Sequence, residues 1–234
     1  MTTREWTELL RTGSIEILGR MPWSSNATFL VVVTTEESEE KAIYKPGLGE
    51  RPLGDFPDRI YRREVAAYEL SEALGLGVVP ETVIRLDGPL DDGSLQRFID
   101  ADYEEHYFTL LEDPRFDAAL RDIAAFDLLL NNADRKGGHL LRGPDDQIWG
   151  IDNGLSFHVQ PKLRTVMWDF AGDPVPEGVR AASELLCDEV PDAVARLLND
   201  AECEALRRRA RELRRSGVFP YPDPSRRQHP WPLV

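Results

Sequence analysis

The chain has 234 residues, of which 41% are hydrophobic and 30% are charged, and its formal net charge at pH 7 is −14. This length is sufficient for one large domain or two small lobes with a real hydrophobic core, and the composition is typical of a soluble globular protein. Nucleic-acid binders need clustered Lys and Arg to neutralise phosphates, so the acidic balance argues against nucleic acid as a partner.

Signals for a membrane or for secretion are not seen in the sequence. No apolar run approaches the ~18 residues of a membrane span, and the polar stretch MTTREWTELLRTG lacks the apolar centre of a secretory signal. Two cysteines, Cys187 and Cys203, argue against a disulfide framework, and we expect both to be reduced on C-terminal helices. The sequence therefore predicts no transmembrane segment and a cytoplasmic location.

Residues 14–46 predict three strands. Apolar and β-branched runs lie on both sides of the polar turn Ser24–Asn26, which indicates two strands within 14–34. An acidic turn at 36–41 then precedes a short strand that ends at Pro46, because proline cannot donate to a β-ladder.

A loop, a helix and two more strands are predicted next. Residues 47–58 are rich in Gly and Pro and lack periodicity, as loops do. Apolar residues at helical spacing over 60–74, followed by Gly75, predict an amphipathic helix. The segments 81–86 and 94–100 predict strands, which gives a mostly antiparallel sheet with one helix.

The pattern becomes helical in the second half of the chain. Residues 117–130 predict a helix, 139–152 a hairpin, and 178–215 two or three helices before a Pro-rich tail. The arginines within 207–215 fit either a solvated helix face or a surface that docks on an anionic partner.

These elements together predict an α+β fold with two lobes, similar in plan to protein kinases. The predicted domains are a β-rich N-lobe over 1–100 and an α-rich C-lobe over 101–234, joined near residues 98–104.

Four charged residues follow one another in an order that a nucleotide kinase requires. Lys45 lies on a predicted strand, Glu64 early in the next helix, Asp134 on a turn, and Asp152 at the end of the hairpin. In kinases a strand Lys binds the α/β-phosphates and a helix Glu positions it. A catalytic-loop Asp accepts the proton of the acceptor hydroxyl, and a later Asp holds Mg²⁺.

Each of these residues also has an ordinary interpretation. Lys45 alone fits an edge-strand lysine, and Asp134–Arg135 alone fits a solvated or paired turn. The shared order, together with a change of lobe between Glu64 and Asp134, is more specific and favours a kinase-like site.

Several motifs resemble the phosphatidylinositol 3/4-kinase superfamily, most of all its type II 4-kinase branch. The stretches NNADRKGGHLL and GIDNGLSFHV resemble the catalytic and metal-binding motifs of that branch. Three more stretches resemble its Lys-Pro strand end, its helix with the next strand, and its hinge; they are YKPGLGERP, REVAAYELSEALGLGVVPETV and GSLQRFIDADY. The resemblance covers about residues 14–175.

The resemblance implies a role for each matching residue. Lys45 contacts the phosphates and Glu64 orients it, Asp134 is the catalytic acid/base, Arg135 braces its loop, and Asp152 binds the metal. The implied cofactors are ATP and Mg²⁺ or Mn²⁺.

The resemblance also implies the walls of the nucleotide site. Gln96, Phe98 and Ile99 belong to the implied hinge, which receives adenine. The turn Ser24, Ser25 and Asn26 covers the phosphates with backbone N–H groups and hydroxyls.

One residue departs from the family pattern. His139 stands five residues after Asp134, where the family has an Asn that ligates the second metal. Imidazole suits softer metals than Mg²⁺. A one-metal site, a preference for Mn²⁺ and lost catalysis are all consistent with this change.

The predicted partners are a nucleotide and a hydroxyl acceptor. The segment 155–176 carries Asp169 and Asp173 beside Lys162 and Arg164, and the sequence pI is about 4.8. Both features disfavour an anionic membrane, so we expect a soluble or protein acceptor rather than a lipid. The alternatives are a phosphatidylinositol kinase, or a pseudokinase that serves as a nucleotide-binding module.

Overall fold

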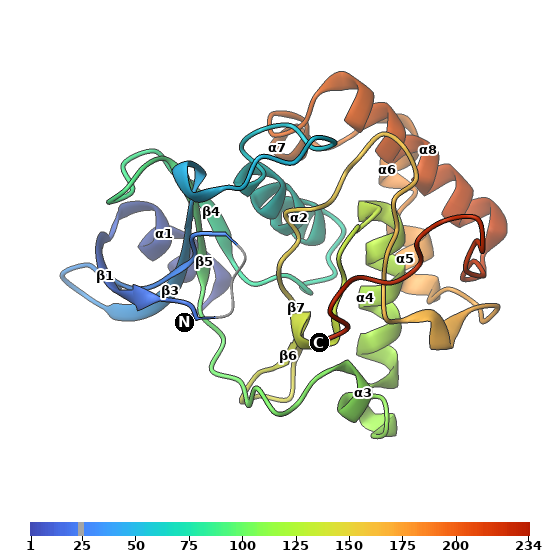
Figure 1. Cartoon of the computed structure of the whole chain (residues 1–234), viewed down its shortest axis with the longest axis horizontal. Coiled ribbons are helices and arrows are strands. Elements are labelled where there is room, and N and C mark those ends of the chain that lie inside the picture. Colours follow the sequence, from blue (N-terminus) through green and yellow to red (C-terminus); the bar gives the residue numbers. More distant parts are fainter. Residues whose placement is uncertain (23–25) are drawn as a thin grey trace.

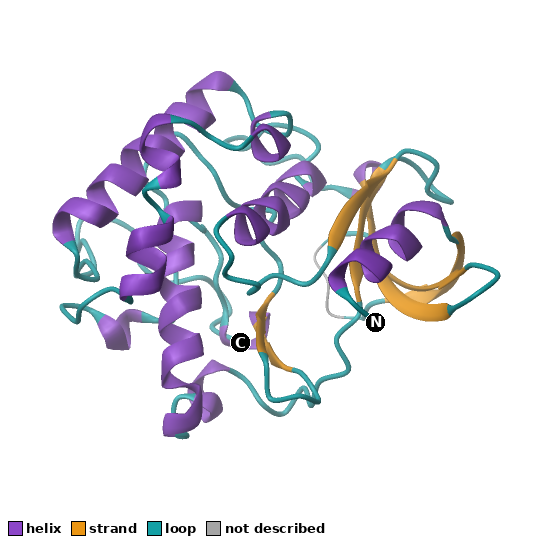
Figure 2. Cartoon of the chain, turned by 180° about the vertical axis from the view of Figure 1, so that it is seen from behind, coloured by secondary structure: helices purple, strands orange, loops and turns teal. Residues whose placement is uncertain are grey.

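The computed structural model describes residues 1–22 and 26–234. An antiparallel sheet makes up one side of the molecule and helices make up the other (Figure 1). Seen from behind, the sheet with the N-terminal helix against it lies on one side and the other helices lie on the opposite side, with a small two-stranded hairpin between them (Figure 2). The α+β organisation predicted from the sequence is therefore present.

The sheet has five strands in the order β1-β2-β3-β5-β4, and all neighbours are antiparallel. The strands are β1 (Ser14–Arg20), β2 (Phe29–Thr34), β3 (Glu39–Pro46), β4 (Thr82–Arg85) and β5 (Gly93–Arg97). The turn predicted at 36–41 is too long, because Glu39 and Glu40 pair with Thr34 and Val33 of β2. Their charged side chains are tolerated because this part of the strand has a solvated face.

A helix that the sequence analysis did not predict precedes the sheet. Helix α1 (Thr3–Thr12) begins with a capping box in which the Thr2 hydroxyl accepts from Glu5 N–H and Glu5 accepts from Thr2 N–H. Trp6, Leu9 and Leu10 are buried and pack with the inward residues of the sheet. This small core contains Val31, Val33, Ala42, Tyr44, Val83 and Leu95.

Helix α2 (Tyr61–Ala73) follows a one-turn 3₁₀ segment (Gly47–Gly49) and a loop. It ends as predicted, with Gly75 in the left-handed region at φ +65°. The prediction of an amphipathic helix is wrong, because residues all around α2, including Arg63 and Glu64, are buried. The helix lies between β4 and β5 on one side and the later helices on the other, so it has little free face.

The remaining elements build the larger, helical part. They are α3 (Tyr107–Leu110), a 3₁₀ turn (Pro114–Phe116), α4 (Asp117–Leu130), a 3₁₀ turn (Gly137–His139), β6 (Leu140–Arg142), β7 (Ile148–Gly150), a 3₁₀ turn (Trp168–Phe170), α5 (Glu177–Ala182), α6 (Leu185–Asp188), α7 (Asp192–Ala195) and α8 (Asp200–Ser216). Four helices, rather than two or three, occupy the fully described stretch 177–216.

The main hydrophobic core lies under α4, where Leu120, Ile123, Phe126 and Leu129 are buried. Both cysteines are free, Cys187 on α6 and Cys203 on α8, as expected. Within the described ranges, no helix is both long and apolar enough to cross a membrane.

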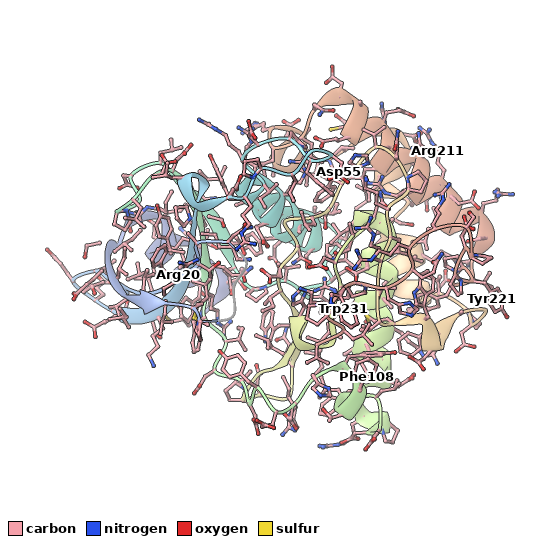
Figure 3. All side chains as sticks on the ribbon, viewed as in Figure 1. Arg20, Asp55, Phe108, Arg211, Tyr221 and Trp231 are labelled. Atoms are coloured by element: carbon pink, nitrogen blue, oxygen red, sulfur yellow. The ribbon has the colours of Figure 1, made fainter. Side chains whose placement is uncertain are left out.

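The last residues fold back over the molecule rather than extending from α8. The Gln228 carbonyl accepts from Thr165 N–H at 3.1 Å and from Trp168 Nε1 at 3.0 Å, and the Leu233 carbonyl accepts from Gly137 N–H at 2.7 Å. Trp231, labelled in Figure 3, belongs to this segment and is 77% exposed.

Candidate active site

Lys45 stands on β3 opposite Ser94 of β5, at the side of the sheet that faces the helical part. Its Nζ lies 2.6 Å from Glu64 Oε1 on α2 and also hydrogen-bonds Asp152 Oδ1. Asp152 comes from the segment after β7, so one ammonium joins three elements that are far apart in the sequence. Hydrogen bonds between an ammonium and two carboxylates are charge-assisted and therefore strong.

Glu64 is the buried centre of this group. Its Oε1 binds Lys45, and its Oε2 accepts from the backbone N–H of Asn153 at 2.8 Å. A Cβ added to Gly154 would stand 3.1 Å from Glu64 Oε1, so any larger residue there would push the Glu64 carboxylate by a few tenths of an ångström. The Asp-Asn-Gly motif is thus docked directly on α2.

Asp152 occupies an unusual backbone conformation, with φ at +57°. Non-glycine residues in this region are uncommon and cluster at functional sites, where the surrounding structure over-determines them. The twist leaves the side chain 48% exposed while one oxygen binds Lys45. Asp152 therefore remains accessible from the cleft.

Electrostatics keep this pair ionised. Enclosure disfavours charge on both residues, but the carboxylates of Asp152 and Glu64 outweigh it and raise the pKa of Lys45. In the same way, enclosure alone would raise the pKa of Asp152, but the Lys45 ammonium reverses that effect and lowers it.

Asp134 lies on the turn after α4, which ends at Asn131 in the left-handed conformation. Its backbone N–H donates to Asn132 Oδ1 at 3.0 Å, and Lys136 Nζ lies 3.2 Å from its Oδ2. Burial raises the pKa of Asp134, and the nearby Lys136 ammonium opposes that rise. A carboxylate with a raised pKa is suited to take up a proton.

Arg135 holds this turn from inside the molecule. It is fully buried, and its guanidinium contacts Asp127 through Nε at 2.8 Å and Nη2 at 2.9 Å. The same group donates to the Ile151 carbonyl at 2.6 Å and to Asn153 Oδ1 at 2.6 Å. Arg135 thereby links the catalytic turn to the segment that carries Asp152.

Two residues that support this turn, Asp127 on α4 and Asn132 after it, were not predicted. Asp127, 1% exposed, receives Arg135 and also the side-chain amide of Asn132 at 3.1 Å. An acidic residue within the apolar run DIAAFDLLL was the available signal, because a buried carboxylate needs a partner.

His139 lies beside Asp152 rather than apart from it. Its Nε2 is 3.4 Å from Asp152 Oδ2, and its Nδ1 accepts from Lys136 N–H at 3.4 Å. Burial lowers the pKa of His139 to about 4, although the Asp152 charge opposes the shift. The ring is therefore neutral near pH 7, and with Nδ1 as acceptor its proton lies on Nε2, toward Asp152.

The side chains fit a metal that is shared with a nucleotide better than a metal bound by protein alone. No group of three or more His, Cys, Asp or Glu suited to a metal occurs among the described residues. Mg²⁺ is commonly held by one or two carboxylates plus substrate phosphates, and the exposed carboxylate of Asp152 can supply such a ligand. His139 would have to move its proton to Nδ1, and give up Lys136 N–H, before Nε2 could bind a metal.

The predicted hinge residues have three different environments. Gln96 is inside β5, and its Nε2 donates to Thr82 Oγ1 at 2.8 Å. Phe98 follows the strand, and its N–H donates to the Lys41 carbonyl. Ile99 is 4% exposed and packs in a small apolar cluster with Leu141 and Trp149 of the hairpin.

The predicted phosphate-covering turn is only partly described. Ser24 and Ser25 lie outside the described residues. The Asn26 side chain accepts from Arg51 N–H at 3.1 Å, which connects it to the loop after β3. The structure thus brings together Lys45, Glu64, Asp152 and His139, with Asp134 linked through Lys136, while Asn26 and the Gln96 side chain have other partners.

Comparison with solved structures identifies the fold. The chain superposes on the Golgi casein kinase crystallised with Mn and ADP, with a TM-score of 0.58, 14% identity and coverage of 96% of this chain and 80% of that one. It also superposes on the structure of hydra Fam20 with sugar, with a TM-score of 0.54, 14% identity and coverage of 93% and 91%. The protein has a kinase-like α+β fold, as the sequence predicts.

Comparison with curated sequences identifies the family. The chain is 39% identical over an alignment of 262 positions to Protein Rv2133c of Mycobacterium tuberculosis strain H37Rv. The alignment covers 96% of this chain and 94% of that protein. The chain belongs to the same family as Protein Rv2133c. No protein-family model matches the chain.

Proposed function

We propose that the protein is an ATP-dependent phosphotransferase that transfers the γ-phosphate of ATP to a hydroxyl acceptor. The contact that carries this proposal is the Lys45 ammonium held between Glu64 and Asp152 in a kinase-like fold. The fold neighbour with bound Mn and ADP supports nucleotide and metal as the ligands of this cleft.

Each side chain has a definite task in this mechanism. Lys45 binds the α/β-phosphates, and Glu64 keeps its ammonium in place. Asp134 accepts the proton of the acceptor hydroxyl, which its raised pKa favours, while Arg135 fixes the turn. Asp152 holds Mg²⁺ or Mn²⁺, which neutralises charge on the phosphates when bound.

The acceptor proposal rests on charge. We infer a soluble or protein acceptor rather than a lipid, since a chain with net charge −14 is repelled by anionic membranes. The PI3/4-kinase-like motifs support a phosphatidylinositol kinase as the second candidate. His139 supports a third, a pseudokinase that binds nucleotide without transfer. A cytoplasmic location remains a prediction.

The decisive experiment uses purified protein and ATP labelled at the γ-phosphate, in Mg²⁺ or Mn²⁺. Parallel reactions contain no acceptor, a mixture of dephosphorylated proteins, or phosphatidylinositol vesicles. Label in protein supports the first proposal, and label in lipid supports the second. A thermal shift with ATP but no label indicates a pseudokinase. If millimolar ATP gives neither a thermal shift nor a labelled product, the protein has no nucleotide site and the proposal is wrong.

A matched pair of variants ties the result to the site. Lys45→Met should abolish the ATP-dependent thermal shift, because it removes the phosphate-binding ammonium. Arg215→Met is the control, since it also removes one positive charge, but at the end of α8, where Arg215 is 77% exposed and pairs with Glu212. Equal loss in both variants would mean that general charge, not the cleft, binds ATP.

A further inference from the structure

Two neighbouring residues of α2 point to opposite sides. Glu64 holds Lys45 and the Asn153 N–H, while Arg63 turns toward the helical part. The Arg63 Nη2 hydrogen-bonds Glu202 Oε1, and its Nε donates to the Ser156 carbonyl at 3.1 Å. Arg63 is 3% exposed and Glu202 is 4% exposed, so this ion pair is almost completely removed from solvent.

Glu202 has a fixed orientation because it also caps α8. Its Oε2 accepts from Asn199 N–H at 2.9 Å, and its own N–H donates to Asn199 Oδ1 at 3.0 Å. This is the reciprocal arrangement of a capping box. One oxygen of the carboxylate is thus bound to the start of α8, and the other is bound to α2.

The Arg63–Glu202 ion pair is close to both the Glu64 side and the Asp152 side of the candidate nucleotide site. Ser156 lies four residues after Asp152, and Glu64 contacts Asn153 in the same segment. Consequently α2 holds this segment at two points, through Glu64 at Asn153 and through Arg63 at Ser156. A displacement of α2 would disturb both Lys45 and Asp152.

Two polar contacts near this junction, one from α2 and one from the loop before it, lie at the surface and are weaker. Arg62 Nη2 donates to the Arg196 carbonyl at 2.7 Å. Asp55, labelled in Figure 3, pairs with Lys162 at 2.6 Å, with its side chain 53% exposed. Exposed pairs contribute little, whereas a buried charge that loses its partner is strongly unfavourable. The Arg63–Glu202 pair therefore fixes the relative position of α2 and α8.

We propose that Arg63 is a positioning residue which, through Glu202 and the Ser156 carbonyl, holds α2 and the Asp152 segment in their nucleotide-binding arrangement. This inference rests on the proposed function for its kinetic consequence. It assigns the first turn of α8, remote in sequence from the kinase-like motifs, to the support of the phosphate site. Helix α2 is then held in place by a buried ion pair to α8.

The test compares single and double replacements. Arg63→Met and Glu202→Leu each leave one buried charge unpaired, and both should lower the melting temperature. The double variant removes both charges, and apolar replacement of a buried pair often restores stability. We expect the double variant to regain only part of its melting temperature, because the α8 cap lost with Glu202 is not restored. Its kcat/KM for ATP should stay about 10²-fold below the parent, because small misplacements have effects of that size.

Conservative and control variants separate positioning from packing. Arg63→Lys keeps a charge for Glu202 but lacks the planar fork that also reaches Ser156. We expect it to fold and to raise the KM for ATP more than it lowers kcat. Arg62→Met, at the adjacent surface contact, should behave like the parent.

Hydrogen exchange gives a readout that does not depend on turnover. In Arg63→Lys and in the double variant, amides of 61–73 and 152–157 should exchange faster, while those of α4 should not change. If either variant folds and matches the parent in exchange and in KM, the proposal is wrong. If the parent transfers no phosphate, the proposed function fails, but the exchange data still decide whether the pair holds these segments.

Discussion

The two sides of the candidate site are stabilised in different ways. The Asp134 side is held by Arg135, which is fully buried and bonded to Asp127 within one short stretch of chain. The Lys45 side is held by contacts between β3, α2 and the segment after β7, and Asp152 there is 48% exposed. The Asp134 turn is therefore built into the helical part, whereas the arrangement around Lys45 depends on how the sheet side and the helical side meet.

This difference teaches where a ligand has room to act. In this structure Lys45 and Asp152 neutralise each other. Phosphates could take the place of Asp152 as the partner of Lys45, and a metal ion could take the place of Lys45 as the partner of Asp152. Arg135 has no such freedom, because its partners are buried protein groups. We expect nucleotide to reorganise the Lys45 side and to leave the Asp134 turn unchanged.

The largest expected effect is on the turn. Arg135→Met should lower the free energy of unfolding by about 3–5 kcal/mol, because it leaves the buried Asp127 carboxylate without its partner. Denaturant unfolding followed by circular dichroism measures this. Arg115→Met is the control, since Arg115 pairs with Asp113 while 64% exposed and should cost about 0–1 kcal/mol. Similar losses in both variants would contradict the contrast drawn here.

Asp134→Asn tests the proposed proton transfer at the turn while leaving the Arg135–Asp127 contacts intact. We expect turnover to fall by about 10²–10⁴-fold, since a general base typically contributes that much. The ATP-dependent thermal shift should persist, because Lys45 and Asp152 bind the nucleotide. Unchanged turnover would remove Asp134 from the mechanism.

His139→Asn tests whether the residue beside Asp152 affects metal use. His139 faces Asp152 Oδ2 at 3.4 Å, and loss of such a supporting contact changes metal affinity or activity by about tenfold or more. We expect the ratio of activity in Mg²⁺ to activity in Mn²⁺ to rise, because an amide oxygen suits the harder ion. Equal activity of parent and variant in both metals would exclude a role for His139 at the metal.

The smallest expected effect concerns pH. In the proposed mechanism Asp134 takes up a proton as the carboxylate, so activity should fall as pH drops through its pKa, which burial raises above that of an ordinary Asp. Lys136→Met removes the opposing ammonium 3.2 Å from Oδ2 and should move the acidic limb to higher pH. Lys136→Arg keeps the charge and should leave the limb in place. A pH–rate profile of kcat for the three proteins gives the answer.

The sequence predicted those parts of the molecule whose signals are local. Periodicity placed α2 and α4, and Gly75 placed the end of α2, because helix faces and stop signals extend over only a few residues. The order of Lys45, Glu64, Asp134 and Asp152 predicted a shared site. The structure brings Lys45, Glu64 and Asp152 into direct contact, while Asp134 pairs with Lys136. Their catalytic roles and the lobe boundary near residue 100 remain predictions.

Other features had no local signal or a misleading one. Arg63 and Glu202 are 139 positions apart, and each alone resembles a surface charge on a helix. The family resemblance implies that Gln96 belongs to the hinge, whereas its side chain lies within the sheet and donates to Thr82. Helix α1 was missed although Thr2 and Glu5 form its capping box, because that stretch was considered only as a possible signal segment.

The Arg63–Glu202 pair also limits how relatives of this chain can be recombined. A chimera that takes α2 from one family member and α8 from another would join two buried residues that did not evolve together. If one parent had changed the charge at either position, the hybrid would contain a buried ion without its counterion, although both parents fold well. Residues 61–73 and 199–216 should therefore be exchanged as one unit.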